Sequence, residues 1–216
     1  MPGRSGPRTW IDQQQELADA LATGQIAPLD WCREVETLSR QVDLAELLAT
    51  ARLAADDVAK PGGPNDPQKR VVHFSDVSGR QQRLSYNAAL IAFQPGNVLT
   101  PRTRRSGVSA HLVLDGALRI RSYDKVRDDR NGMMIRPAGD VIVGVGKVST
   151  MCAERRPVHW LVPKGGPATV LEVSIGGNAE EVMPLDPLGG KILKDGSILA
   201  PMIGQDAAAL KYTSDL

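Results

Sequence analysis

The first 60 residues carry apolar side chains every three or four positions, which is the spacing of an amphipathic helix. Three helices are predicted, starting near Thr9, Pro28 and Asp43. Thr9 is expected to begin the first helix through a capping box with Asp12. The proline- and glycine-rich segment 61–67 cannot continue a helix and marks a linker.

From Arg70 onward the apolar period changes to two, as in strands with one buried face. Short alternating segments separated by glycine and proline turns continue to about Gly177, a spacing typical of a β-sandwich or small barrel. Asp115-Gly116 is expected to close a hairpin, because its turn requires positive φ. The charged segment 124–132 is predicted to be a surface loop.

These patterns divide the chain into an N-terminal helical segment (1–60), a β-barrel (70–177) and a loop-rich C-terminal tail (178–216) that is expected to wrap the barrel. The formal net charge of +1 disfavours nucleic acid or an anionic membrane as a partner. No apolar run approaches the roughly 20 residues of a membrane helix, and the first nine residues lack the apolar stretch of a signal peptide. Cys32 and Cys152 have no metal-ligand spacing, so reduced thiols and a cytoplasmic setting are expected.

The stretch from Leu84 to Asp124 resembles the first motif of the cupin family, and more narrowly the cysteine-dioxygenase-like cupins. Pro95-Gly96 matches the turn before the motif, and Leu114-Asp115-Gly116 matches the hairpin after it. The resemblance implies a mainly β fold, a cupin-type jelly-roll barrel. It also implies an iron site, but the two histidines of the motif fall on Arg102 and Arg104.

The segment from Pro157 to Leu161 resembles the second cupin motif and keeps its single histidine, His159. A guanidinium stays protonated and repels a cation, so the resemblance implies a degenerate metal site and no cofactor. A remnant iron site of His111, His159 and an acid such as Glu172 is the alternative.

Inward-facing strand positions could bring arginines and histidines into one cavity. Guanidinium groups bind carboxylate or phosphate, and an imidazole titrates near neutral pH, so the implied ligand is a small anionic metabolite. The alternative is a solvated arginine loop with His111 as a hydrogen-bonded core residue. The candidate residues are His159 and His111 for catalysis, and Arg102, Arg104, Tyr86 and Trp160 for substrate binding.

Three functions fit this pattern, because a fold alone does not decide function. The first is a cupin-fold enzyme that performs metal-independent acid/base chemistry on a small anionic metabolite, as an isomerase, cyclase or lyase. The second is a non-catalytic small-molecule-binding cupin, and the third is a non-haem iron thiol dioxygenase with atypical ligands. A homodimer is expected if a partner covers an open sheet edge, and a monomer if the N-terminal helices cover it.

Overall fold

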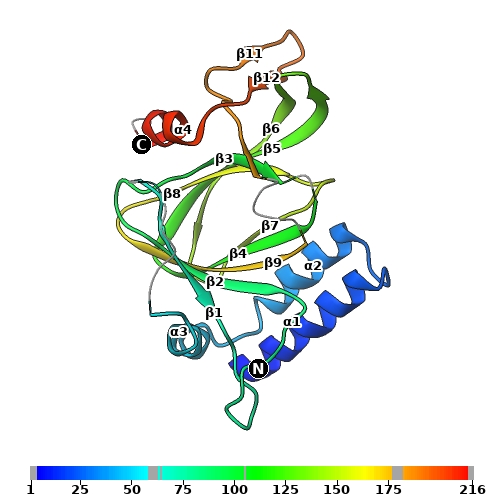
Figure 1. The fold of residues 1–216 in the computed structure, drawn as a ribbon, viewed down its shortest axis with the longest axis vertical. Coiled ribbons are helices and arrows are strands. Elements are labelled where there is room, and N and C mark those ends of the chain that lie inside the picture. The colour runs from blue at the N-terminus through cyan, green and yellow to red at the C-terminus, as the bar shows by residue number, and fades with distance from the viewer. Residues whose placement is uncertain (1–3, 58–62, 64, 105, 177–181, 214–216) are drawn as a thin grey trace.

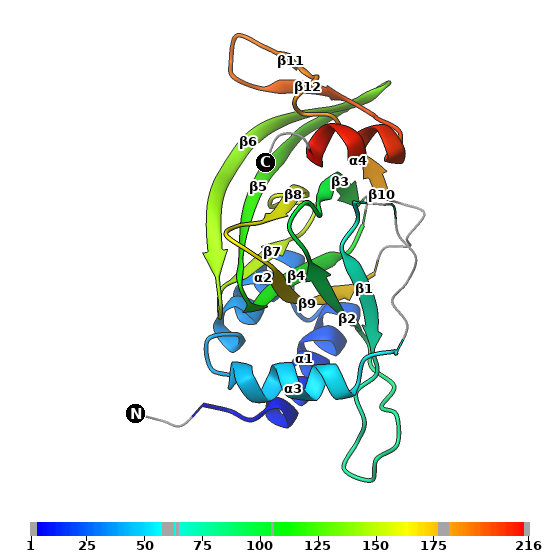
Figure 2. The ribbon, with the colours of Figure 1, turned by 90° about the vertical axis from the view of Figure 1, so that its left-hand side faces the viewer.

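The computed structural model describes residues 4–57, 63, 65–104, 106–176 and 182–213. Two β-sheets face each other, and three helices cover the outer face of one of them (Figure 1). A fourth helix and a short hairpin lie at the opposite end of the molecule (Figure 2). The helices are α1 (Pro7–Ala22), α2 (Pro28–Leu38), α3 (Leu44–Leu53) and α4 (Gln205–Thr213).

The three N-terminal helices confirm the helical period read from the sequence, although α1 begins differently. The side chain of Asp43 accepts hydrogen bonds from the backbone N–H groups of Ala45 and Glu46, so it caps α3. Helix α1 has no side-chain cap and begins at Pro7, whose fixed φ suits the first helical turn. The capping box predicted at Thr9 is therefore wrong, because Thr9 already lies inside the helix.

All strand pairs between named strands are antiparallel. The five-stranded sheet contains, in spatial order, β1 (Gln68–Val72), β2 (Asn87–Phe93), β9 (Ala168–Ile175), β4 (Val108–Asp115) and β7 (Val148–Met151). The seven-stranded sheet contains β10 (Val182–Pro184), β3 (Leu99–Arg104), β8 (Val158–Pro163), β5 (Ala117–Asp129), β6 (Gly132–Gly144), β12 (Ile198–Pro201) and β11 (Lys191–Ile192).

Strands β2 to β9 follow the connectivity of a jelly roll. One sheet runs β2-β9-β4-β7 and the other runs β3-β8-β5-β6, so the chain crosses repeatedly between the sheets. This order is the double Greek key of an eight-stranded jelly roll, the architecture that cupin barrels share. The predicted mainly β, jelly-roll fold with an N-terminal helical segment is confirmed. Strands β1 and β7 form the edges of one sheet, and β10 and β11 form the edges of the other. An edge strand could pair with a second copy of the chain, so the homodimer stays a prediction.

The Asp115-Gly116 turn is present, but it does not close a hairpin. Strand β4 pairs with β7 and β9, whereas β5 pairs with β6 and β8, so the turn carries the chain from one sheet to the other. Gly116 has φ 72°, and a Cβ atom there would lie 2.2 Å from the carbonyl oxygen of Pro167. The prediction of left-handed backbone was right for Gly116 and wrong for Asp115, and the prediction of pairing was wrong.

Two other segments are more regular than their sequence suggested. Residues 124–132, predicted to be a loop, form the outer half of the long β5–β6 hairpin, whose alternating charges lie on exposed strand positions. The described part of the tail adds three short strands between its loops: β10 pairs with β3, and β12 pairs with β6 and β11. Within the described residues, no helix has the length and apolar character needed to span a bilayer.

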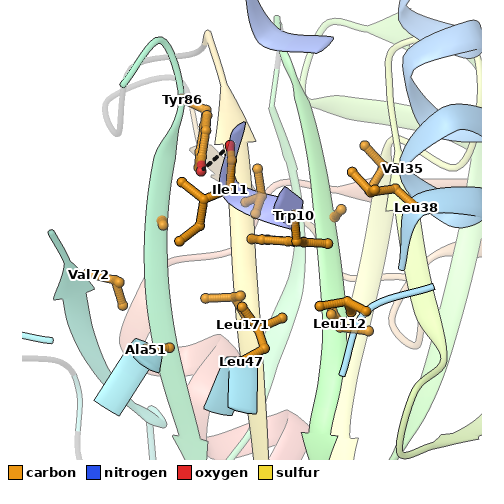
Figure 3. Packing of buried hydrophobic residues seen from close by; sticks show 14 of the residues in the cluster. Trp10, Ile11, Val35, Leu38, Leu47, Ala51, Val72, Tyr86, Leu112 and Leu171 are labelled. Atoms are coloured by element: carbon orange, nitrogen blue, oxygen red, sulfur yellow. Dashed lines mark hydrogen bonds between the residues drawn. The ribbon is translucent and has the colours of Figure 1, made fainter. Parts of the chain in front are cut away.

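Strand alternation separates two cores. Side chains on the outer face of the five-stranded sheet pack against α1–α3, around residues such as Trp10, Leu47 and Leu112 (Figure 3). The inner faces of both sheets meet in a second cluster. It contains Ile91, Phe93, Val113, Leu118, Ile120, Leu161, Ala168 and Val170.

Candidate functional site

The interior of the barrel changes from apolar to polar along its length. Val113 on β4 pairs with Val170 on β9, and both belong to the inner apolar cluster. Two residues further along the same strands, His111 pairs with Glu172, and both side chains are buried. Because strand residues two positions apart share a face, these polar groups lie on the inner face beside the apolar cluster.

The facing sheet supplies a second polar group at this level. His159 on β8 pairs with Ser122 on β5 and with Arg102 on β3. His159 and Ser122 are buried, and Leu161, two residues beyond His159, belongs to the inner apolar cluster. Beside the apolar cluster lies a polar layer, formed by His111 and Glu172 on one sheet and by His159 and Ser122 on the other.

The two buried histidines face each other across the barrel. Their ring centroids are 5.3 Å apart, with an angle of 47° between the ring planes. His111 is 1% exposed and His159 is 7% exposed. The structure thus brings together the two residues that the sequence analysis proposed for acid/base chemistry.

Glu172 joins this pair to a lysine that sequence reasoning missed. Its Oε1 lies 3.6 Å from Nε2 of His111, and its Oε2 forms an ion pair with Nζ of Lys69 on β1. Burial alone would raise the pKa of Glu172, but the adjacent imidazole of His111 and the ammonium of Lys69 hold it well below its usual range. Glu172 is therefore a buried carboxylate that stays ionised at neutral pH.

The ring nitrogen atoms of His111 are buried and have no close hydrogen bond among the described residues. In the portion of the chain that the structure describes, neither ring nitrogen has a hydrogen-bond partner, and the Glu172 contact is longer than a hydrogen bond. Buried polar groups are usually hydrogen-bonded, so an exception calls for a physical explanation. A bound water or a ligand in the polar layer would supply the partner.

Arg102 lies next to His159 on the neighbouring strand β3. Its backbone pairs with that of His159, and its guanidinium donates hydrogen bonds of 3.3 Å to the carbonyl and hydroxyl oxygens of Thr100. Arg102 is partly buried. Arg104 is the last residue of β3, and its side chain lies outside what the structure describes.

Tyr86 and Trp160, the two aromatic residues proposed for substrate binding, do not lie in this layer. Tyr86 packs between α1 and the five-stranded sheet, where its hydroxyl donates to the carbonyl oxygen of Ile11 at 3.4 Å (Figure 3). Burial raises the pKa of Tyr86. Trp160 follows His159 directly on β8 and so faces outward, where it packs edge-to-face on Tyr212 at 4.8 Å. Neither aromatic side chain lies beside the two facing histidines.

A transition metal, which the resemblance to cupins implies, does not fit the donors present. A metal ion needs three or four deprotonated ligands at defined angles. Among the residues whose placement is described, no three His, Cys, Asp or Glu side chains form such a group. The carboxylate of Glu172 is already neutralised by Lys69, and Arg102 adds a fixed positive charge beside His159.

Comparisons with known proteins give no family for this chain. No protein-family model and no curated protein matches the chain. Among solved structures, it is similar to procruciferin, an 11S globulin from Brassica napus, with 14% identity over 63% of this chain and 32% of that chain and a TM-score of 0.44. It therefore spans about a third of the globulin.

Two smaller proteins are also similar. KdgF from a Halomonas species matches with 15% identity over 56% of this chain and 88% of that chain, at a TM-score of 0.39. An uncharacterised double-stranded β-helix protein from Klebsiella pneumoniae subsp. pneumoniae matches with 16% identity over 57% and 88% of the two chains, at a TM-score of 0.37. The strand order, and not these distant likenesses, identifies the jelly roll.

Proposed function

We propose that this chain is a cupin-fold enzyme that moves a proton on a small anionic metabolite without a metal, as an isomerase, cyclase or lyase. The observation that carries the proposal is the pair of facing, buried imidazoles of His111 and His159 in the polar layer of the barrel. General acid/base catalysis requires a group that titrates near the working pH and lies within reach of the transferred proton. Imidazole meets the first requirement without a cofactor.

The surroundings give the two histidines different tasks. The Glu172 carboxylate beside Nε2 of His111 favours the tautomer with its proton on that nitrogen and fixes the ring. His159 has no carboxylate among its cross-strand neighbours Ser122 and Arg102. In the proposed mechanism His159 takes the proton from the substrate, and His111 binds or protonates the opposite side.

Arg102 would hold the anionic group of the substrate. Its backbone is paired with that of His159, and a guanidinium can bind a carboxylate or phosphate through two parallel hydrogen bonds. An anion held there would place its neighbouring carbon atom near the imidazole. The apolar cluster beyond Val113 and Leu161 would exclude water from one end of the cavity, which strengthens these interactions.

Proton transfer can be tested before the substrate is known. A mixture of small carboxylates and phosphate esters in D₂O, incubated with the protein, is expected to show loss of a C–H signal in the proton NMR spectrum of one component. His159→Gln should abolish that exchange, and Arg102→Ala should weaken binding of the same component. Treatment with a strong metal chelator should leave the exchange rate unchanged.

The third histidine of the chain provides a matched control. His73 is exposed and bonded to Asp56 and Gln81, remote in sequence and sheet position from the facing pair. His73→Gln should keep the wild-type exchange rate. Exchange that survives His159→Gln, or that disappears with the chelator and returns with iron, would contradict the proposal.

A non-catalytic binding protein is the second candidate, and the unpartnered nitrogen atoms of buried His111 are the observation in its favour. Such a protein would bind one component of the mixture without exchanging its C–H protons. Binding that depends on Arg102 and His111, with no exchange or turnover in any component, would favour this function.

A further inference from the structure

A second pocket lies outside the barrel, on the outer face of the seven-stranded sheet. It has a volume of about 240 Å³ and is bounded by the turn Pro95-Gly96 and by the turn around Lys164. Trp160 and Val162 on β8 form part of its apolar lining. Because Trp160 and His159 are consecutive in a strand, this pocket and the polar layer of the barrel lie on opposite faces of the same sheet.

Positive charge exceeds negative charge around this pocket. Arg119 and Arg121 line it, and both bind the carboxylate of Asp140: Arg119 through two hydrogen bonds of 2.7 Å and Arg121 through Nε at 3.2 Å. The hydrogen bond from Arg119 lowers the pKa of Asp140, so this acid is ionised. Lys164 is the third cation, and it has no acidic partner in the described part of the chain. The pocket lining thus carries three positive charges, two of which are paired with the single carboxylate of Asp140.

Arg119 and Arg121 use different numbers of their hydrogen-bond donors. Arg119 donates to Asp140 through both Nε and a terminal nitrogen atom. Arg121 donates only through Nε within the described ranges. The guanidinium carbon of Arg121 lies 4.4 Å from the centroid of the Trp160 ring, so the ring holds the group in place. The terminal nitrogen atoms of Arg121 are therefore positioned donors that have no acceptor among the described residues.

Trp160 is the aromatic component of the site. Its side chain is 2% exposed, and in the described residues its indole Nε1–H has no hydrogen-bond acceptor. A buried indole N–H usually finds a partner. An anionic group in the pocket would offset the positive charge of the lining, which exceeds the single carboxylate of Asp140.

We propose that this outer pocket binds a small carboxylate that carries a single planar ring. The volume is below the range of about 300–1,000 Å³ typical of sites for drug-sized ligands, which limits the ligand to about one ring. The excess of positive charge, three cations against the single carboxylate of Asp140, selects the carboxylate, and the apolar lining that includes Val162 and Trp160 selects the ring. The site is independent of the acid/base chemistry proposed for the barrel interior.

Benzoate and its uncharged isostere benzamide are suitable probes. The chain has three tryptophans, and each indole N–H gives one signal in a ¹⁵N-correlated NMR spectrum; Trp160→Phe identifies the signal of Trp160. Benzoate should shift that signal in a saturable way, with a dissociation constant of about 1 mM or lower, whereas benzamide should bind at least about tenfold more weakly. Trp10 and Trp31 lie in the helix-covered core, so their signals serve as internal references.

Variants locate the effect in the pocket. Lys164→Ala should weaken benzoate binding about tenfold, whereas Lys194→Ala, at another exposed lysine, should leave it unchanged. The Trp160 response should persist in Arg102→Ala and His159→Gln, which separates this site from the barrel interior. The proposal is overturned if benzoate at 20 mM (about twenty times the expected dissociation constant) leaves the Trp160 signal in place. Equal binding of benzamide, or an unchanged affinity in Lys164→Ala, would also overturn it.

Discussion

The ion pair between Lys69 and Glu172 can be tested by replacing Lys69 with methionine. This change keeps most of the side-chain length and removes the ammonium group that neutralises the buried carboxylate. Glu172 would then keep the imidazole of His111 beside it but lose its contact with the ammonium group. We expect the free energy of unfolding to fall, because an ionised carboxylate is poorly stabilised away from water.

The magnitude follows from how deeply the two partners are buried. Breaking a fully buried ion pair costs about 3–5 kcal/mol, whereas an exposed pair contributes about 0–1 kcal/mol. The Glu172 side chain is 7% exposed but that of Lys69 is 37% exposed, so solvent screens one partner. An intermediate loss of about 2 kcal/mol at pH 7 is expected for Lys69→Met.

The loss should depend on pH in a defined direction. The pKa of Glu172 is depressed in the folded protein, so its stabilising contribution is present above the unfolded pKa of about 4.3 and is lost as the pH falls through the folded value. Removing Lys69 takes away one cause of the depression. The difference in unfolding free energy between wild type and Lys69→Met should therefore be largest near pH 7 and shrink at about pH 3.

Urea unfolding at both pH values, followed by circular dichroism, measures this difference. The control is Lys125→Met, since Lys125 is similarly exposed (36%) but pairs with the exposed Asp128; its loss should be at most about 0.5 kcal/mol. A double-mutant cycle of Lys69→Met with Glu172→Gln should give a coupling above about 1 kcal/mol. A Lys69→Met loss no greater than that of the control, or one that grows at low pH, would refute the reasoning.

Three further predictions concern the frame around the site. Gly116→Ala should destabilise the fold by more than about 2 kcal/mol, because the added Cβ would lie 2.2 Å from the carbonyl oxygen of Pro167. Gly79→Ala is the control for thermal unfolding: Gly79 has a similar φ but open space around it, so the loss should be about 1 kcal/mol. Cys32 should resist alkylation at pH 8 until the protein unfolds, because burial raises its pKa to about 12; mass spectrometry detects the adduct. Tyr86→Phe should cost about 1 kcal/mol in urea unfolding and leave ligand binding in the barrel unchanged.

Periodicity predicted the elements of this fold well because it is a local signal. The change from helical to alternating spacing near residue 70 coincides with the start of β1 at Gln68. Pairing between strands is not local, and the Asp115-Gly116 turn illustrates the difference. Its residues predict the backbone angle of a tight turn, but the same turn can join two strands of one sheet or pass between two sheets.

The contribution of Lys69 could not be read from the sequence for the same reason. Lys69 and Glu172 lie 103 positions apart in the sequence. They meet because β1 and β9 both pair with β2, one on each side of it. A partial signal existed: Glu172 is an acid within an otherwise apolar strand, and a buried carboxylate needs a cationic or hydrogen-bonding partner. That signal predicts that a partner exists without identifying it.

His159 and Trp160 are neighbours in the second motif, so the sequence analysis placed both in one site. The alternation of side chains along β8 explains why the structure places them in two. A motif groups residues by closeness in sequence, whereas a strand sends consecutive side chains to opposite faces. His159 therefore belongs to the polar layer with His111, and Trp160 belongs to the outer pocket with Arg121. Substitutions of His159 and of Trp160 therefore probe separate places. A Trp160 variant that changes ligand binding beside His159 would have to act through the backbone of β8.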